Sequence, residues 1–249
     1  MALDELWCVQ PEWPAAMAWE ALKDRDFDVA PVAERVIHRF VQRGALAGTD
    51  RSVLDHALPI TADHLVSSDL GLAAGLRLLA EQRFYFVLKG DRISSIVTLA
   101  DLQRPPVSMV ALAFILSAES DLDILIRRTL GNGEWRASLP ASRLARASNI
   151  LDAQRSYNTT IDLLQCLTLH DRARIVSKTP ALLNILAYSQ GDWDNWTRRV
   201  KHLRNVLAHG GNVLDDAPDP EDAIRHFNAT RDFAGRVHRC MLQVGASEL

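Results

Sequence analysis

Apolar residues recur at helical spacing through most of the chain that follows residue 107. The clearest stripe lies near the C-terminal end, with intervals of three and four residues: Trp193, Trp196, Val200, Leu203 and Leu207. This period places one apolar face of a helix against a core. Asp192 suits the start of this helix, and the Gly210-Gly211 pair suits its end. The pattern therefore predicts a helix over 191–209.

The same periodicity predicts further helices over four other stretches: 108–130, 141–168, 180–189 and 219–244. The helical pattern is broken at three places between these helices: at the glycines 131 and 133, at the Thr179-Pro180 step and across the segment GGNVLDDAPDP. We expect an all-helical bundle with long antiparallel members over 108–249.

Before the Pro105-Pro106 pair, short β-type runs alternate with helical ones. One unit is predicted as a strand over 64–69, a helix over 70–82 and two strands over 84–90 and 93–102. A shorter unit upstream is predicted as a helix over 14–25 and two strands over 27–34 and 35–46. Two imperfect copies indicate an internal repeat. The predicted fold class is α+β, with an α/β domain over 1–107 and the helical domain over 108–249.

The stretch FYFVLKGDRISSIVTLADL, from Phe84 to Leu102, resembles the second half of a CBS domain, in which two strands precede a helix opened by T-x-x-D. The resemblance implies a tandem pair that binds an adenine nucleotide or adenosyl effector, with Thr98 and Asp101 holding the ribose hydroxyls. Ser95 replaces a glycine usual in that family, and FVQRGAL in the first copy has no T-x-x-D, so the first copy is degenerate. The alternative is that Thr98 and Asp101 only cap a helix.

Arg204, Asn205 and His209 form an R-N-x-x-x-H pattern directly before the glycine pair. With the preceding segment LTLHDRARIVSK and the penultimate position of the helix, this resembles a HEPN domain, a helical bundle that is usually dimeric and in many members a ribonuclease. The resemblance makes Arg204 and His209 catalytic and Asn205 the polar residue that follows the arginine. The alternative is that Arg204 and His209 only complement the helix dipole.

The chemistry of such a site requires no metal. The 2′-hydroxyl of RNA is the nucleophile, a histidine moves protons, and an arginine neutralises the phosphate. On an ideal helix, however, Arg204 and His209 lie roughly 140° apart around the axis and about 7.5 Å apart along it. Either the glycine pair bends the chain back, or two copies pool their side chains across a dimer. We expect the homodimer.

Composition limits the remaining options. Among 249 residues, 48% are hydrophobic and 24% charged, and the net charge of -3 excludes a protein that coats nucleic acid through global basicity. Cys8, Cys166 and Cys240 are few and far apart, which is typical of reduced thiols and offers no metal site. The N-terminus does not resemble a signal peptide, and the apolar run VSMVALAFIL is about half of the roughly 20 residues that a membrane span needs. We expect a cytoplasmic protein with no membrane contact.

The leading hypothesis is a metal-independent endoribonuclease, a toxin or defence effector, that acts on RNA and is regulated by a ligand of the CBS-like domain. The alternative is a non-enzymatic nucleotide sensor whose helical domain serves for dimerisation or docking. A third option is the toxin half of a pair, silenced by a nucleotidyltransferase antitoxin.

Overall fold

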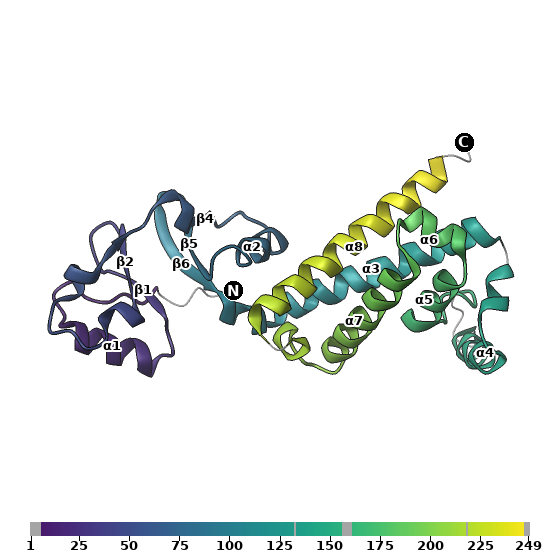
Figure 1. The fold of residues 1–249 in the computed structure, drawn as a ribbon, viewed down its shortest axis with the longest axis horizontal. Helices are drawn as coiled ribbons and strands as arrows, with labels where there is room; N and C mark the ends of the chain where they lie inside the picture. Colours follow the sequence, from purple (N-terminus) through teal and green to yellow (C-terminus); the bar gives the residue numbers. More distant parts are fainter. Residues whose placement is uncertain (1–5, 132, 156–160, 218, 247–249) are drawn as a thin grey trace. The chain divides into compact units, whose positions relative to one another are not determined.

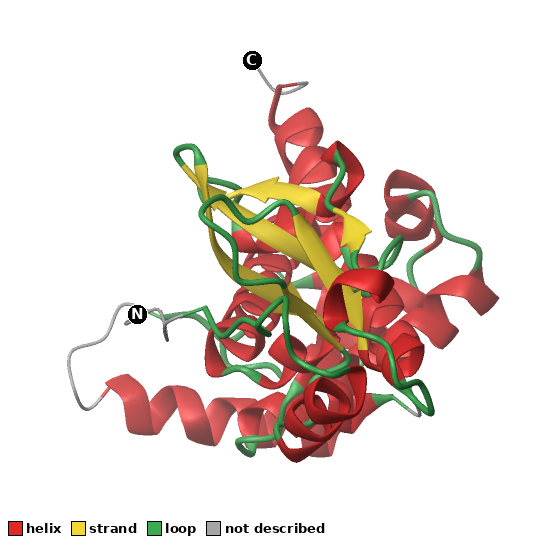
Figure 2. Ribbon diagram, turned by 90° about the vertical axis from the view of Figure 1, so that its left-hand side faces the viewer, coloured by secondary structure: helices red, strands yellow, loops and turns green. Residues whose placement is uncertain are grey.

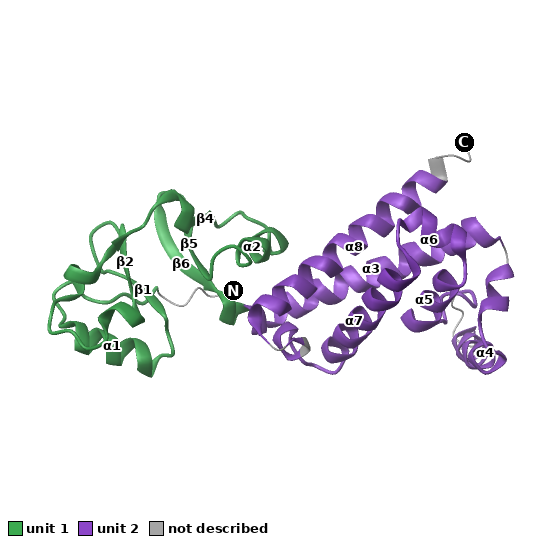
Figure 3. Ribbon diagram, in the orientation of Figure 1, with its two compact units in different colours: residues 1–101 green, residues 102–249 purple. Residues whose placement is uncertain are grey.

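The computed structural model describes residues 6–131, 133–155, 161–217 and 219–246. The chain divides into two compact units, Met1–Asp101 and Leu102–Leu249 (Figure 3). The sequence placed this boundary after residue 107 instead. Pro105 and Pro106 form the first turn of a long helix, where proline is tolerated because its missing N–H has no helical partner. The proline pair therefore starts the second unit and does not link the two.

The first unit contains two three-stranded sheets among its described residues (Figure 2). In the first sheet, β2 pairs antiparallel with both β1 and β3; in the second, β5 pairs parallel with β4 and antiparallel with β6. The elements and their bounds are α1 Ala15–Asp24, β1 Val29–Pro31, β2 Arg39–Gln42, β3 Leu58–Pro59, β4 Leu65–Ser67, α2 Leu72–Leu78, β5 Phe84–Lys89 and β6 Arg92–Thr98.

The two halves of this unit follow one order of elements. In the second half, β4 is followed by α2, by β5 parallel to β4, by β6, and by the 3-10 helix η4 at Leu99–Gln103. In the first half, a parallel bridge between Val9 and Val32 stands in the place of the β4–β5 pairing. Helix α1, strands β1 and β2 and the 3-10 helix η1 at Arg43–Leu46 follow in the same order. Phe40 of β2 contacts Phe84 and Phe86 of β5 at ring-centroid distances of 5.4 and 5.6 Å, which joins the two sheets.

The second unit is built from helices (Figure 1), with these bounds: α3 Pro105–Leu130, α4 Ala141–Arg155, α5 Leu169–Ser177, α6 Pro180–Leu186, α7 Gln190–Ala208 and α8 Pro220–Ala246. Helices α3 and α8 run parallel side by side, so the expectation of long antiparallel members is wrong for this pair. Phe114 contacts Phe227 near their starts, and Arg128 Nη1 donates to the Met241 carbonyl at 2.8 Å near their ends. The mixed α+β class is confirmed by this architecture.

The predicted stripe of α7 is confirmed, since Trp193, Val200, Leu203 and Leu207 are buried. Trp196 is partly buried and packs against the core cluster that contains Trp193. The predicted helix 141–168 is wrong in part. Helix α4 ends at Arg155, residues 156–160 lie outside the described residues, and a separate helix, α5, begins at Leu169. The new start is fixed by a capping box, in which Thr168 and Asp171 satisfy each other's backbone N–H groups.

Within the described residues, no helix combines the length and the apolar character that a membrane span requires.

Candidate active site

Helix α7 carries the three residues of the R-N-x-x-x-H pattern. Its first turn is capped by Ser189, whose hydroxyl accepts a hydrogen bond from the Asp192 N–H at 3.1 Å. At its other end, His209 is the C-cap residue, and its N–H still donates to the Asn205 carbonyl at 3.1 Å, as in a continuing helical turn. The helix thus remains regular up to His209.

The two glycines that follow have a structural role of their own. Gly210 has φ +84°, the left-handed conformation that ends many helices. The Gly210 N–H donates to Leu207 O at 3.2 Å, and the Gly211 N–H donates to Val206 O at 3.0 Å, which is the Schellman pattern. A Cβ on Gly211 would lie 2.6 Å from Val206 Cγ1 and 3.0 Å from Val206 O. The pair ends the helix and does not swing His209 back along it.

Arg204, Asn205 and His209 differ in exposure. Arg204 is partly buried, whereas Asn205 and His209 are exposed. No hydrogen bond or ion pair links Arg204 to His209 within the described part of the chain. A single copy therefore places the two predicted catalytic groups on α7 but does not bring them into contact.

Arg204 lies near a partly buried carboxylate that the sequence interpretation missed. Burial raises the pKa of Glu119 on α3, and the nearby charges of Arg172 and Arg204 act against this rise. Glu119 Oε2 lies 3.4 Å from Arg172 Nη1, while Oε1 is buried without a hydrogen-bond partner among the described atoms. A signal was present in the sequence, because Glu119 and Asp123 stand four residues apart and therefore lie on one face of a helix that is mostly apolar up to residue 118.

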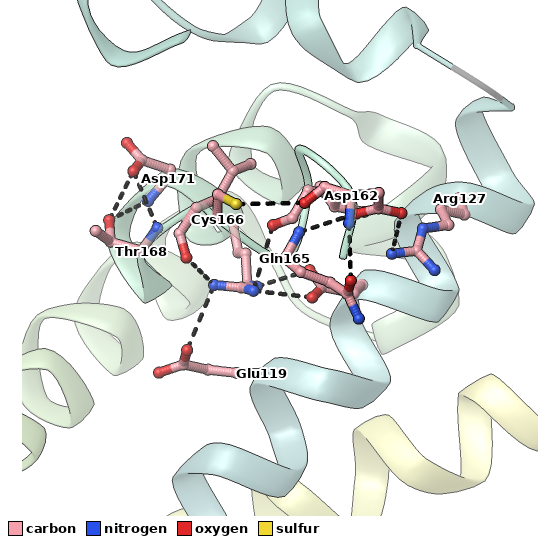
Figure 4. A network of polar contacts seen from close by, with 11 residues as sticks. Glu119, Arg127, Asp162, Gln165, Cys166, Thr168 and Asp171 are labelled. Atoms are coloured by element: carbon pink, nitrogen blue, oxygen red, sulfur yellow. Dashed lines mark hydrogen bonds and ion pairs between the residues drawn. The ribbon is translucent and has the colours of Figure 1, made fainter. Parts of the chain in front are cut away.

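Glu119 belongs to a polar network (Figure 4). Arg172 of α5 is the central donor of this network. Its Nε and Nη2 donate to the two oxygens of Asp123 at 2.7 and 2.8 Å, and Nη2 also donates to Leu164 O at 3.3 Å. Its Nη1 donates to the Leu167 carbonyl. Burial still raises the pKa of Asp123 above its ordinary value, although the hydrogen bonds from Arg172 oppose it. The network fixes α3 against α5, and the charge of Arg204 acts on Glu119 at its edge.

In the first unit, Thr98 and Asp101 lie together at the start of η4. The Thr98 N–H donates to Asp101 Oδ2 at 2.8 Å, and Thr98 Oγ1 lies 3.5 Å from the same oxygen. This is the capping geometry that the sequence left open as an alternative. In the first half of the unit, Gln42 at the end of β2 corresponds to Thr98, and Ala45 corresponds to Asp101. The first half therefore has no carboxylate at the position of Asp101.

Among the described residues, no group of three or more His, Cys, Asp or Glu side chains is placed to hold a metal ion.

No known family model matches this sequence, and no curated protein is significantly similar to it. Seventeen chains among the solved structures match. One is the crystal structure of Hypoxic Response Protein I with two coordinated zinc ions, which is 18% identical, with 40% of this chain and 90% of that chain covered and a TM-score of 0.32. A likeness of this size carries no information about the function of this chain.

Proposed function

We propose that the protein is a metal-independent endoribonuclease whose helical unit is HEPN-like and whose catalytic residues are Arg204 and His209, with Asn205 beside them. The observation that carries the proposal is the end of α7. There an exposed histidine at the C-cap follows five residues after a partly buried arginine, and the partly buried carboxylate of Glu119 lies near that arginine. A toxin or a defence effector is the class of protein that such an activity suits.

The reaction needs three contributions from the protein. His209 accepts the proton of the 2′-hydroxyl, whose oxygen attacks the adjacent phosphorus, or donates a proton to the departing 5′ oxygen as the P–O5′ bond breaks. Arg204 holds two phosphate oxygens and stabilises the charge of the transition state. The helix end orients the phosphate in line with the nucleophile. The products are a 2′,3′-cyclic phosphate and a 5′-hydroxyl.

Because one copy leaves Arg204 and His209 apart, the proposed site is formed by two copies. A two-fold axis near the C-terminal ends of two α7 helices supplies the His209 of one copy to the Arg204 of the other, and it does so twice. The exposure of Asn205 and His209 supports this arrangement, since both side chains face outward from the helix.

The decisive experiment is cleavage of labelled single-stranded RNA and transfer RNA in EDTA by the wild type, Arg204→Ala and His209→Ala. We expect wild-type cleavage that leaves cyclic phosphate ends, with losses of at least about a hundredfold in both variants. Cleavage that persists in His209→Ala, or that requires a divalent metal, would refute the proposal.

Regulation by an adenine nucleotide or adenosyl effector is the second part of the proposal, with Thr98 and Asp101 as the ribose-binding pair. The repeated order of elements in the first unit and the position of Asp101 in the first turn of η4 support it. Isothermal titration of ATP, AMP and S-adenosylmethionine into wild type and Asp101→Ala tests binding. RNA cleavage with each ligand at saturation tests regulation, which is refuted if binding leaves the rate unchanged.

One observation favours a different function, a non-enzymatic nucleotide sensor. Gly210, Gly211 and the helical turn at His209 are all accounted for by helix termination, without any catalysis. Overexpression separates the two functions, because His209→Ala abolishes toxicity in a ribonuclease and leaves the phenotype of a sensor unchanged. If the wild type is toxic, co-expression with a candidate nucleotidyltransferase tests for an antitoxin partner.

A further inference from the structure

A cluster of basic side chains lies where α4, α5 and α7 meet. Helix α5 packs on α7 through the Trp193 indole N–H, which donates to the Ala173 carbonyl at 2.9 Å. Arg143 of α4 lies 3.7 Å from Asp171 Oδ1 of α5, and Arg174 Nε donates to Ser138 O, just before α4, at 3.2 Å. Helix α4, the segment just before it and helix α7 therefore all contact the start or the middle of α5.

The electrostatics of His170 identify the other members of this cluster. Partial burial of the imidazole lowers the pKa of His170 on α5, and the positive charges of Lys201, Arg143 and Arg174 lower it further, while Asp171 raises it. Lys201 of α7 thus lies close enough to His170 to act on its charge. We call the set Arg143, His170, Arg174 and Lys201 the basic cluster.

The acidic residue of this region does not neutralise the surface. Asp171 is only 4% exposed, and its Oδ2 accepts a hydrogen bond from the Thr168 hydroxyl at 2.7 Å. His170, Arg174 and Lys201 are exposed, and Arg143 is partly exposed. The solvent therefore meets mainly positive charge, although the whole chain has a net charge of -3.

The basic cluster is continuous with Arg204. Lys201 and Arg204 are three residues apart on α7, which puts them on neighbouring turns of one helix face, about 4.5 Å apart along the axis. Guanidinium and ammonium groups in such a row suit the successive phosphates of a single strand, because each phosphodiester carries one negative charge and accepts hydrogen bonds.

We infer that Arg143, His170, Arg174 and Lys201 bind the phosphate backbone of single-stranded RNA and lead that strand to Arg204. The inference rests on the proposed ribonuclease function, whose substrate the basic cluster holds. It also explains how an acidic protein binds a polyanion, since the contact is local.

The test measures binding of a short fluorescein-labelled single-stranded RNA by anisotropy, with the full chain carrying His209→Ala so that the RNA stays intact. Lys201→Glu and Arg174→Glu are each added to this background. The matched control is Arg199→Glu, the same charge reversal on the same helix, at an exposed residue that lines the groove between α7 and α8.

We expect Lys201→Glu and Arg174→Glu to weaken binding roughly tenfold and to reduce the slope of log K against log salt by about one each, with little change in Arg199→Glu. Equal weakening in all three variants would mean that only net charge matters and would overturn the inference. Unchanged binding in Lys201→Glu and Arg174→Glu, or no binding of RNA to the starting protein, would overturn it as well.

Cleavage assays with His209 intact separate this inference from the proposed function. A raised KM with unchanged kcat in Lys201→Glu supports both. Cleavage by the wild type with an unchanged KM in Lys201→Glu refutes the RNA-binding role of the basic cluster and leaves the ribonuclease standing. Binding that depends on Lys201 without any cleavage refutes the ribonuclease and leaves the RNA-binding surface standing.

Discussion

Arg172 and Asp123 form a bidentate ion pair inside the helical unit, with N···O distances of 2.7 and 2.8 Å. The two residues are 4% and 5% exposed and come from α5 and α3. The carbonyls of Leu164 and Leu167 accept further hydrogen bonds from the same guanidinium. A buried charge with its donors engaged in this way fixes the position of α5, because each alternative placement would leave polar groups unpaired.

Removing Asp123 alone therefore carries a large cost. We expect Asp123→Ala to lower the free energy of unfolding by about 3–5 kcal/mol, because the charge of Arg172 stays buried without its bidentate partner. Urea denaturation followed by circular dichroism measures this. The control is Asp232→Ala, which breaks the surface pair between Arg231 and Asp232 and costs at most about 1 kcal/mol.

The double variant Asp123→Ala with Arg172→Met completes the cycle. If the buried charge causes the loss, the double variant is more stable than Asp123→Ala alone. A double variant less stable than either single variant would show that the pair contributes net stability.

Glu119 gives the protein a dependence of stability on pH. Burial raises the pKa of its carboxyl in the folded state, so the folded protein holds a proton that the unfolded chain has released. Stability therefore falls as pH rises, from the unfolded pKa of about 4.3 through the raised folded pKa. Glu119→Gln removes this loss, and we expect a higher urea midpoint than the wild type at neutral pH and a flatter pH profile.

The same variant affects the proposed reaction in the opposite direction. The Glu119 carboxylate is the negative charge near Arg204, and a neutral amide no longer favours one position of the guanidinium. We expect Glu119→Gln to cleave RNA more slowly although it is the more stable protein. A variant that is less stable than the wild type at neutral pH would contradict the pKa direction on which this prediction depends.

The features that the sequence predicted well depend on local periodicity. The stripe from Trp193 to Leu207 and the strands β5 and β6 follow from spacing alone, because their apolar side chains face a core in register with the helix or strand period. The separation of Arg204 and His209 around α7 follows in the same way, from 100° per residue.

The features that the sequence missed depend on contacts between distant segments. Helix α5 contains Asp171 and Arg172, which look like surface residues in the sequence but are each 4% exposed. The burial of Arg172 is possible only because Asp123, far away in the chain, pairs with it. The two-residue strand β3 likewise exists only through pairing with β2, and its length gives no periodic signal.

The end of α7 depends on Gly210. Any other residue there would have to adopt φ +84°, which costs an L-residue roughly 1 kcal/mol. We expect Gly210→Ala to lower the free energy of unfolding by about 1 kcal/mol. The control is Gly191→Ala in the first turn of the same helix, where a Cβ meets nothing within 4 Å. That variant should be neutral or more stable by up to about 1 kcal/mol, and equal losses in both variants would exclude the helix end as the cause.

A site formed by two copies predicts complementation. In a mixed dimer of Arg204→Ala and His209→Ala, one of the two sites combines the intact His209 of the first variant with the intact Arg204 of the second. We expect two inactive proteins to recover about a quarter of the wild-type rate when they are refolded together, since half of the dimers are mixed and each has one intact site. No recovery, with mixed dimers demonstrated by tagged pull-down, would place both residues in one copy's site.

His170 provides a direct reporter of RNA on the basic cluster. In the RNA-free protein its pKa lies below the ordinary value of about 6.5. Partial burial of the ring and then the charges of Lys201, Arg143 and Arg174 disfavour the imidazolium, and the charge of Asp171 opposes them. A phosphate bound among these groups adds negative charge and raises the pKa of His170. By linkage, RNA then binds more tightly as pH falls through the interval between the free and the bound pKa.

Proton NMR of the imidazole, with the RNA-free and RNA-saturated His209→Ala proteins titrated side by side, measures both values. His170→Gln identifies the resonance and should bind RNA with a flatter pH profile. Lys201→Glu should raise the pKa of His170 even without RNA, because a cation is replaced by an anion next to the ring. A pKa for His170 that is the same with and without bound RNA would mean that no phosphate lies near the ring and that the strand reaches Arg204 over another face of α7.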